Sequence, residues 1–190
     1  MTLLLITPPA IEPISLAEAR LQCRIDDTVD DTLLAIYIQS ARQQAEHRLG
    51  RSLITQTWER VLDAWPTDIR LGRPPVLSVV SVTYIGADLQ EHTVPSTDYA
   101  LDSTTEPGYV IPVSTWPTAA DVANAVRVRF TCGYGPAATD VPAPVRSWML
   151  LTVGALSAQR EAVDLSGRSR ELPSRFWDAL LDAETFYGVQ

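Results

Sequence analysis

The chain has 190 residues, of which 46% are hydrophobic and 20% are charged, and its formal net charge is -8. This size and composition predict one folded domain over residues 1–190. The apolar run at residues 3–6 is far too short to cross a bilayer, so no membrane contact is expected. Residues 1–10 contain no basic side chain, which argues against a signal peptide and favours the cytoplasm. The acidic balance disfavours tight binding of nucleic-acid phosphates.

Two helices are predicted over residues 13–50. Ser15 and Glu18 have the spacing of a capping box, and the helix they begin is expected to run to about Arg24. The next helix is expected to begin among acidic residues and to end with basic residues before Gly50, which complements the helix dipole at both ends. The acidic residues are Asp26, Asp27, Asp30 and Asp31. An apolar stripe at helical spacing predicts the buried face: Leu34, Tyr37, Ile38, Ala41, Ala45 and Leu49.

From residue 52 the hydrophobic period changes to two, which predicts a strand. Its apolar side holds Ile54, Trp58 and Leu62, and its polar side holds Thr55, Thr57 and Glu59. A long β-branched strand is expected over residues 76–85, closed by a turn at residues 86–88. Further strands are expected at residues 90–94, 99–101, 109–113 and 124–132. Residues 52–135 are therefore predicted to form an antiparallel sheet.

Helical character returns towards the end of the chain. A core helix is expected over residues 142–160, because proline suits its first turn and a broad apolar stripe follows. Residues 161–173 have little to bury and are predicted to be a mobile connector, and a final helix is expected over residues 174–188. The predicted fold class is α+β, a helical body with an inserted antiparallel sheet.

No catalytic, metal or cofactor site is predicted. His47 and His92 have no metal-ligand spacing, and Cys23 and Cys132 are interpreted as buried free thiols. The acidic residues at 26–31 lack the turn glycine and distal glutamate of a calcium loop, so helix-dipole compensation explains them better. Residues 133–135 lack the pattern of a phosphate or dinucleotide loop. These features argue against an enzyme.

The final helix is unusually aromatic and follows a polar connector. Two interpretations remain open: its apolar face covers the chain's own core, or it docks in a groove of another protein. In the second interpretation the candidate partner interface consists of Arg168, Arg170, Phe176, Trp177, Leu180, Leu181, Phe186 and Tyr187.

The order of these pieces resembles the tailed-phage head-tail connector proteins, also called portal adaptors. The likeness begins with Pro-Ile-Ser-Leu-Ala-Glu-Ala at residues 13–19 and continues through Ala-Glu-His-Arg-Leu-Gly-Arg at 45–51 and Leu-Ile-Thr-Gln-Thr-Trp at 53–58. It extends through residues 71–84, 98–101, 116–117 and 126–135, with Val-Pro at 141–142. Each piece is a packing or turn signature, and their joint order carries the resemblance.

The resemblance implies a structural role in the neck of a virion or phage-like particle, assembled in the bacterial cytoplasm. It implies a ring, expected to be dodecameric, that sits beneath the portal protein and extends the DNA channel. Double-stranded DNA would pass without sequence-specific binding, and the ring would offer a surface for a stopper or other neck or tail protein. The C-terminal helix is expected to dock into the portal.

Three alternatives remain open on the sequence. The first is another neck or tail-completion protein, such as a stopper or terminator. The second is a small hydrolase with an unrecognised site, which would need a pocket of converging polar groups. The third is a bacterial interaction module outside any particle.

Overall fold

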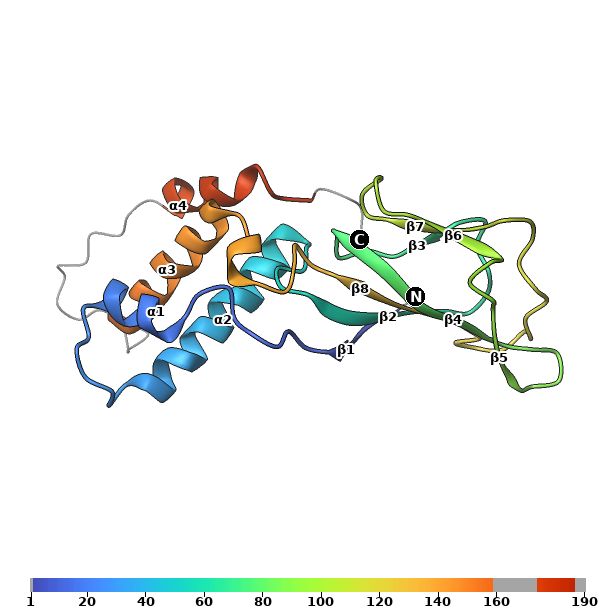
Figure 1. The fold of residues 1–190 in the computed structure, drawn as a ribbon, viewed down its shortest axis with the longest axis horizontal. Coiled ribbons are helices and arrows are strands. Elements are labelled where there is room, and N and C mark those ends of the chain that lie inside the picture. The colour runs from blue at the N-terminus through green and yellow to red at the C-terminus, as the bar shows by residue number, and fades with distance from the viewer. Residues whose placement is uncertain (1, 159–173, 187–190) are drawn as a thin grey trace.

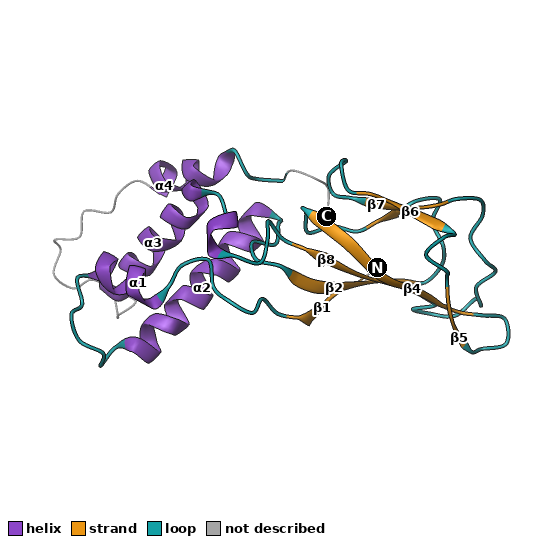
Figure 2. Cartoon of the chain, in the orientation of Figure 1, coloured by secondary structure: helices purple, strands orange, loops and turns teal. Residues whose placement is uncertain are grey.

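The computed structural model describes residues 2–158 and 174–186. Helices gather at one end of an elongated molecule and strands at the other, as Figure 1 and Figure 2 show. This arrangement confirms the predicted α+β class. Two hydrophobic clusters fill the two ends, one among the helices and one among the strands.

The helical end contains α1 (Leu16–Cys23), α2 (Asp31–Leu49), α3 (Ala143–Ala158) and α4 (Ser174–Asp182). The predicted capping box is present: the Ser15 amide donates to Glu18 Oε2 at 2.7 Å, and the Glu18 amide donates to Ser15 Oγ at 3.2 Å. The hydrogen bonds that the Ser15 amide and hydroxyl donate to Glu18 Oε2 lower the pKa of the Glu18 carboxyl below its usual value. Local side-chain chemistry thus sets where α1 begins.

The apolar stripe of α2 is buried as predicted except at Tyr37, which is only partly buried. Leu34, Ile38, Ala41, Ala45 and Leu49 all lie in the helical core, where α2 packs against α1 and α3. The helix begins at Asp31, the last residue of the acidic group, whose Oδ1 accepts a hydrogen bond from Arg20 Nε at 2.7 Å. This contact ties the start of α2 to α1. At the other end Gly50 adopts a left-handed conformation, φ 67°, that ends the helix.

The strands form two antiparallel sheets, where one was predicted. The larger sheet has the order β1 (Thr2–Thr7), β2 (Gln56–Leu62), β8 (Val126–Cys132), β4 (Val76–Ile85) and β5 (Glu91–Thr93). The smaller sheet has the order β3 (Ile69–Arg70), β7 (Tyr109–Pro112) and β6 (Tyr99–Asp102). Apolar side chains of both sheets share the second core, among them Phe130 and Val110.

The structure corrects several sequence predictions. Strands β1 and β3 were not predicted, and β2 begins at Gln56 because residues 52–55 run beside residues 133–135 instead of joining the sheet. Glu59, predicted on a polar outer side, is buried because Arg129 and Arg127 cover it on the neighbouring strand. Cys23 is only partly buried, whereas Cys132 is fully buried as predicted, and both thiols are free.

The predicted connector at residues 161–173 lies outside the described residues, as do residues 187–190. The final helix, predicted over residues 174–188, ends at Asp182, and residues 183–186 follow it without helical structure. Within the described ranges no helix is both long and apolar enough to cross a membrane. His47 is exposed on α2, and His92 pairs with Asp88 at 2.9 Å. Over the same part of the chain, no group of three or more histidine, cysteine, aspartate or glutamate side chains could hold a metal ion.

Candidate functional site: the helix–sheet junction and the outer surfaces

Two chain segments, residues 53–55 and 133–135, run side by side where the helices meet the sheets. The Thr55 amide donates to the Gly135 carbonyl at 3.0 Å, and the Tyr134 amide donates to the Leu53 carbonyl at 3.0 Å. The Gly133 amide donates to the Pro75 carbonyl at 2.9 Å, which connects these segments to the residue just before β4. We call this region, residues 50–56 with 133–137, the junction. Its backbone hydrogen bonds fix the orientation of the helical end relative to the sheets.

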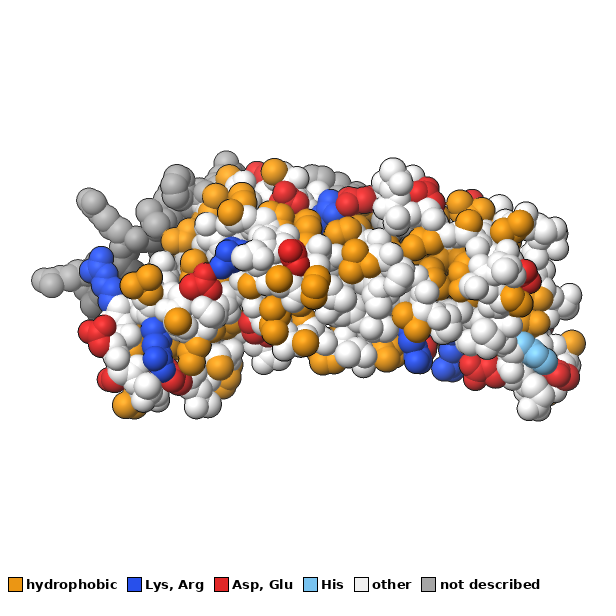
Figure 3. Space-filling view, in the orientation of Figure 1, with side chains coloured by type: hydrophobic (Ala, Val, Ile, Leu, Met, Phe, Trp, Pro, Cys, Tyr) orange, Lys and Arg blue, Asp and Glu red, His pale blue; other side chains and the backbone are white. Residues whose placement is uncertain are grey.

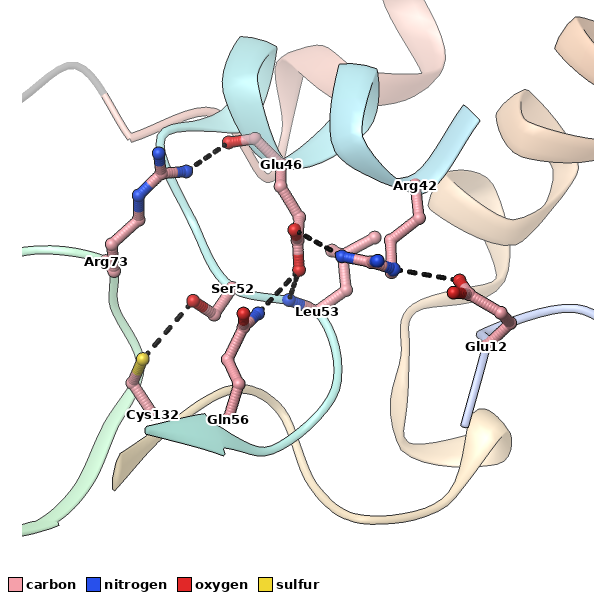
Figure 4. Close-up of polar contacts among 8 residues, drawn as sticks. All are labelled: Glu12, Arg42, Glu46, Ser52, Leu53, Gln56, Arg73 and Cys132. Atoms are coloured by element: carbon pink, nitrogen blue, oxygen red, sulfur yellow. Dashed lines mark hydrogen bonds and ion pairs between the residues drawn. The ribbon is translucent and has the colours of Figure 1, made fainter. Parts of the chain in front are cut away.

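A buried carboxylate holds the junction together (Figure 4). Glu46 of α2 accepts hydrogen bonds at Oε1 from the Leu53 amide at 3.1 Å and from Gln56 Nε2 at 2.7 Å. Its Oε2 accepts from Arg42 Nη1 at 2.9 Å. Glu46 and Arg42 are only 6% and 5% exposed, so they pair almost without water. The carboxylate therefore joins α2 directly to the start of β2.

Two further arginine contacts extend this network. Arg42 Nε donates to Glu12 Oε2 at 2.8 Å, which connects α2 to the segment before α1. Arg73 Nη1 donates to the Glu46 backbone carbonyl at 3.1 Å, and its guanidinium lies over the Trp58 ring, 5.0 Å from the centroid. The loop before β4 is thereby held against both α2 and β2, and the two ends of the molecule share one polar contact region.

The end of the described chain returns to this region. The Phe186 amide donates to the Leu49 carbonyl at 2.9 Å and so satisfies one of the last backbone acceptors of α2. Arg51 donates through Nε to the Glu184 carbonyl at 2.6 Å and through both terminal nitrogens to the Glu106 carboxylate at 2.6 Å each. The Tyr134 hydroxyl donates to Glu184 Oε2 at 2.6 Å, and burial, reinforced by that hydrogen bond, raises its pKa. Residues 184–186 are therefore fastened to the junction.

The candidate interface residues of the C-terminal segment lie in several environments. Leu181 is 3% exposed and belongs to the helical core, while Trp177 and Leu180 are partly buried against that core. Phe186 lies near the guanidinium groups of Arg51 and Arg70, each 6.0 Å from its ring centroid. Arg168, Arg170 and Tyr187 lie outside the described residues, as does the side chain of Phe176. Leu181 therefore fits the first interpretation, in which the helix covers the chain's own core. The docking of this helix on a partner stays a prediction.

The contacts of α4 also involve charge. Asp178 pairs with Arg48 of α2 and accepts a hydrogen bond from Trp148 Nε1 at 3.3 Å. The Arg48 guanidinium lies 5.3 Å from the centroid of the Trp148 ring. These contacts could not be found from sequence spacing, because Asp178 lies 130 residues from Arg48. They hold α4 in one orientation across α2 and α3.

The outer face of the larger sheet carries paired charges and isolated apolar side chains. Arg129 donates to Glu59 Oε2 through Nη2 at 2.8 Å, and Arg127 Nη1 lies 3.9 Å from Glu59 Oε1. Leu77 and Val80 of β4 are exposed. Figure 3 shows apolar side chains spread along one face of the molecule between acidic and basic groups. A hollow between α1 and α3 is open to solvent and lined by Glu18, Leu21, Gln22, Arg24 and Leu150.

Stability is expected to fall at alkaline pH because of Cys132. Burial raises the pKa of its thiol to about 12, against 9.0 in the unfolded chain. Above pH 9 the unfolded chain loses this proton while the folded chain keeps it, so the free energy of unfolding decreases by about 1.4 kcal/mol per pH unit until about pH 12. Urea unfolding between pH 8 and 11 measures this slope. Cys132→Ser removes the thiol and should flatten the decline, leaving the part due to Tyr134, and an unchanged slope would contradict the assignment.

Fold and surfaces together define a class: an α+β protein with a helical end and a sheet end, joined by buried charged side chains. Residues 13–84, from the start of α1 through most of β4, match the family described as phage gp6-like head-tail connector protein. This match confirms the resemblance to head-tail connectors seen in the sequence. No curated protein matches the chain significantly.

Solved structures with the same fold come from gene transfer agent (GTA) particles. A chain in the neck of an empty GTA particle, computed with C6 symmetry, superposes with a TM-score of 0.83 at 20% identity, covering 100% of this chain and 98% of that chain. A chain in the neck of the native particle, computed with C12 symmetry, gives 0.79 at 20% identity and the same coverage. A chain in the native virion gives the same values. At this identity the matches establish the fold over the full length.

Proposed function

We propose that the protein is a structural head-tail connector in the neck of a tailed phage or phage-like particle. The observation that carries the proposal is the agreement of two independent comparisons. Residues 13–84 match the connector family, and the complete fold is similar to chains from GTA necks over nearly their whole length. The matched family is structural, which argues against the hydrolase alternative.

The chain acts as one subunit of a ring, in this proposal a dodecamer. Neck structures with C6 and C12 symmetry contain chains of this fold, and repeated heterologous contacts close into such rings when the rotation between copies allows. The ring extends the DNA channel below the portal. The net charge of -8 suits a lumen through which DNA slides, because few cationic contacts would retain the phosphates.

Attachment to the portal involves the C-terminal segment. Trp177 and Leu180 are only partly buried, so each has surface left for a second protein. Leu181 contributes by keeping α4 on the body, because its side chain has almost no exposed surface. Aromatic and aliphatic anchors of this kind commonly dominate binding energy when a partner covers them. The opposite face of the ring would receive a stopper or another neck protein.

A stopper or terminator would also form a ring, and the level in the neck separates it from a connector. Electron microscopy of particles assembled with the full-length chain is expected to show rotationally symmetric density in direct contact with the portal. Density only at a lower level, bound to another neck protein, would favour the stopper. Binding to neither would overturn the proposal.

Trp177→Ala tests the attachment surface. We expect it to weaken binding to portal-containing particles at least about tenfold, the effect of losing 1.4 kcal/mol of contact energy. Trp116→Ala is the matched control, because it also removes a partly buried tryptophan, here from a stack with Trp65 at the strand end, 4.4 Å between ring centroids. Co-sedimentation with particles measures both, and equal losses would argue against a role for α4 in attachment.

A further inference from the structure

Strand β1 forms an open border of the larger sheet. It pairs with β2 on one side, with Leu3 opposite Arg60 and Leu4 opposite Glu59, and no strand among the described residues pairs with its other side (Figure 1). Every residue from Thr2 to Thr7 except Leu3 is exposed. Alternate residues of β1 therefore direct backbone N–H and C=O groups away from the sheet, where they can pair with another strand.

The sequence of this border lacks most devices that block strand pairing. Thr-Leu-Leu-Leu-Ile-Thr contains no charge and no proline, and its only irregularity is a register shift between Leu5 and Thr7. The other border of the same sheet, β5, has only three residues and includes Glu91 and His92. A short, charged border resists pairing, whereas a longer, uncharged, apolar border favours it. The two borders of the sheet thus differ in the property that governs strand addition.

We propose that β1 pairs through its free border with a second copy of this chain, so that strand addition forms part of the contact between neighbouring subunits. The inference rests on the proposed ring. The contact is heterologous, because a ring joins β1 of one copy to a different surface of the next. Backbone hydrogen bonds supply the pairing, and the exposed side chains of Leu4 and Ile6 are covered by the neighbour.

The absence of charge on β1 suits a second copy of this chain as the occupant. Copies that each carry a net charge of -8 repel one another, so their contacts are best placed where neither acidic nor basic groups must lose water. The β1 border is such a place, since no ionisable side chain occurs between Thr2 and Thr7. A chain of this fold also lies in a neck computed with C12 symmetry, and in a ring of that symmetry each copy presents the same pair of different surfaces to its two neighbours.

The double variant Leu4→Lys/Ile6→Lys tests the contact. Both side chains are exposed, 45% and 41%, and Leu4 lies opposite Glu59, so the lysines should leave the fold intact. We expect ring assembly on portal particles to weaken about tenfold or more, because a neighbouring strand would have to bury two ammonium groups. Val29→Lys/Val113→Lys is the matched control: it introduces the same charge at positions that are 84% and 68% exposed, away from β1.

Hydrogen exchange of the full-length chain, free and assembled on portal particles, gives a direct second measurement. Strand addition protects alternate amides of residues 2–7 in the assembled ring, whereas contact through side chains alone leaves them exchanging. If the wild-type ring assembles on the portal with no gain of protection, or if both double variants assemble equally well, the β1 inference is overturned and the connector function stands. If the wild-type chain joins no ring at any portal, the proposed function fails and the inference with it.

Discussion

Replacing Glu46 by glutamine is expected to lower the free energy of unfolding by about 3 kcal/mol, the cost of removing one partner from a buried ion pair. The glutamine can present its oxygen to the Leu53 amide and Gln56, but its NH₂ group then faces Arg42 Nη1 and both groups are donors. If the side-chain amide flips, its NH₂ group faces the Leu53 amide and Gln56 Nε2, which are also donors. Neither orientation satisfies the buried groups, so the junction loses a contact in either case. Urea unfolding measures the loss.

Glu12→Gln is the matched control. It removes the other carboxylate bound to Arg42, but the Glu12 side chain is 32% exposed, so water replaces part of the lost contact. We expect a cost of about 1 kcal/mol or less. Arg42→Met combined with Glu46→Gln should recover part of the loss, because the unpaired buried cation is then gone. A Glu46→Gln effect no larger than that of Glu12→Gln would contradict the proposed role of Glu46.

Local sequence patterns predict the elements whose cause is local. Ser15 and Glu18 are three residues apart, and their reciprocal hydrogen bonds need no other part of the chain. The stripe of α2 follows from helical geometry, and the β-branched run at residues 76–85 forms β4 with the predicted ends. For such elements, propensity, period and end signals agree, and the fold preserves what they specify.

The contacts of the junction could not be predicted, because the residues that meet there come from separate segments of the chain. Arg42 and Glu46 have the four-residue spacing of an ordinary exposed helix pair, and nothing in that spacing indicates burial. Their environment is created by Gln56, Leu53 and Arg73, which reach Glu46 only after the chain leaves α2 and returns. Strand β1 was missed for a different reason: a short apolar run without alternation does not distinguish a strand from other apolar segments.

The two proposed contacts of the subunit use different elements: the portal contact uses a helix, and the contact between copies uses the border of a sheet. The portal contact uses a helix that the body already holds through Leu181 and Asp178, so its position is set before any partner arrives. The contact between copies uses a strand border whose pairing groups are satisfied only on assembly. The junction lies between them and must keep the sheets at a fixed angle to the helices if one ring is to satisfy both contacts.

Gly133→Ala is expected to cost about 3 kcal/mol or more, for two reasons that add. Gly133 has φ 129°, a conformation that side chains rarely adopt, and an added Cβ would lie 2.6 Å from the carbonyl carbon and oxygen of Ile54. These are backbone atoms of the neighbouring segment, so relief would require residues 53–55 to move away from residues 133–135 and break their hydrogen bonds. Thermal and urea unfolding measure the change.

Gly154→Ala provides the matched control, with the opposite sign. This glycine lies within α3, and a Cβ there would approach only the Gln22 side chain, at 3.5 Å and 3.6 Å, which is ordinary contact. Alanine is favoured over glycine in a helix by about 1 kcal/mol, so this variant should be more stable than the natural chain. If Gly133→Ala unfolds at the same urea concentration as the natural chain, the two segments can separate without cost. The junction would then not be what holds the sheets at a fixed angle to the helices.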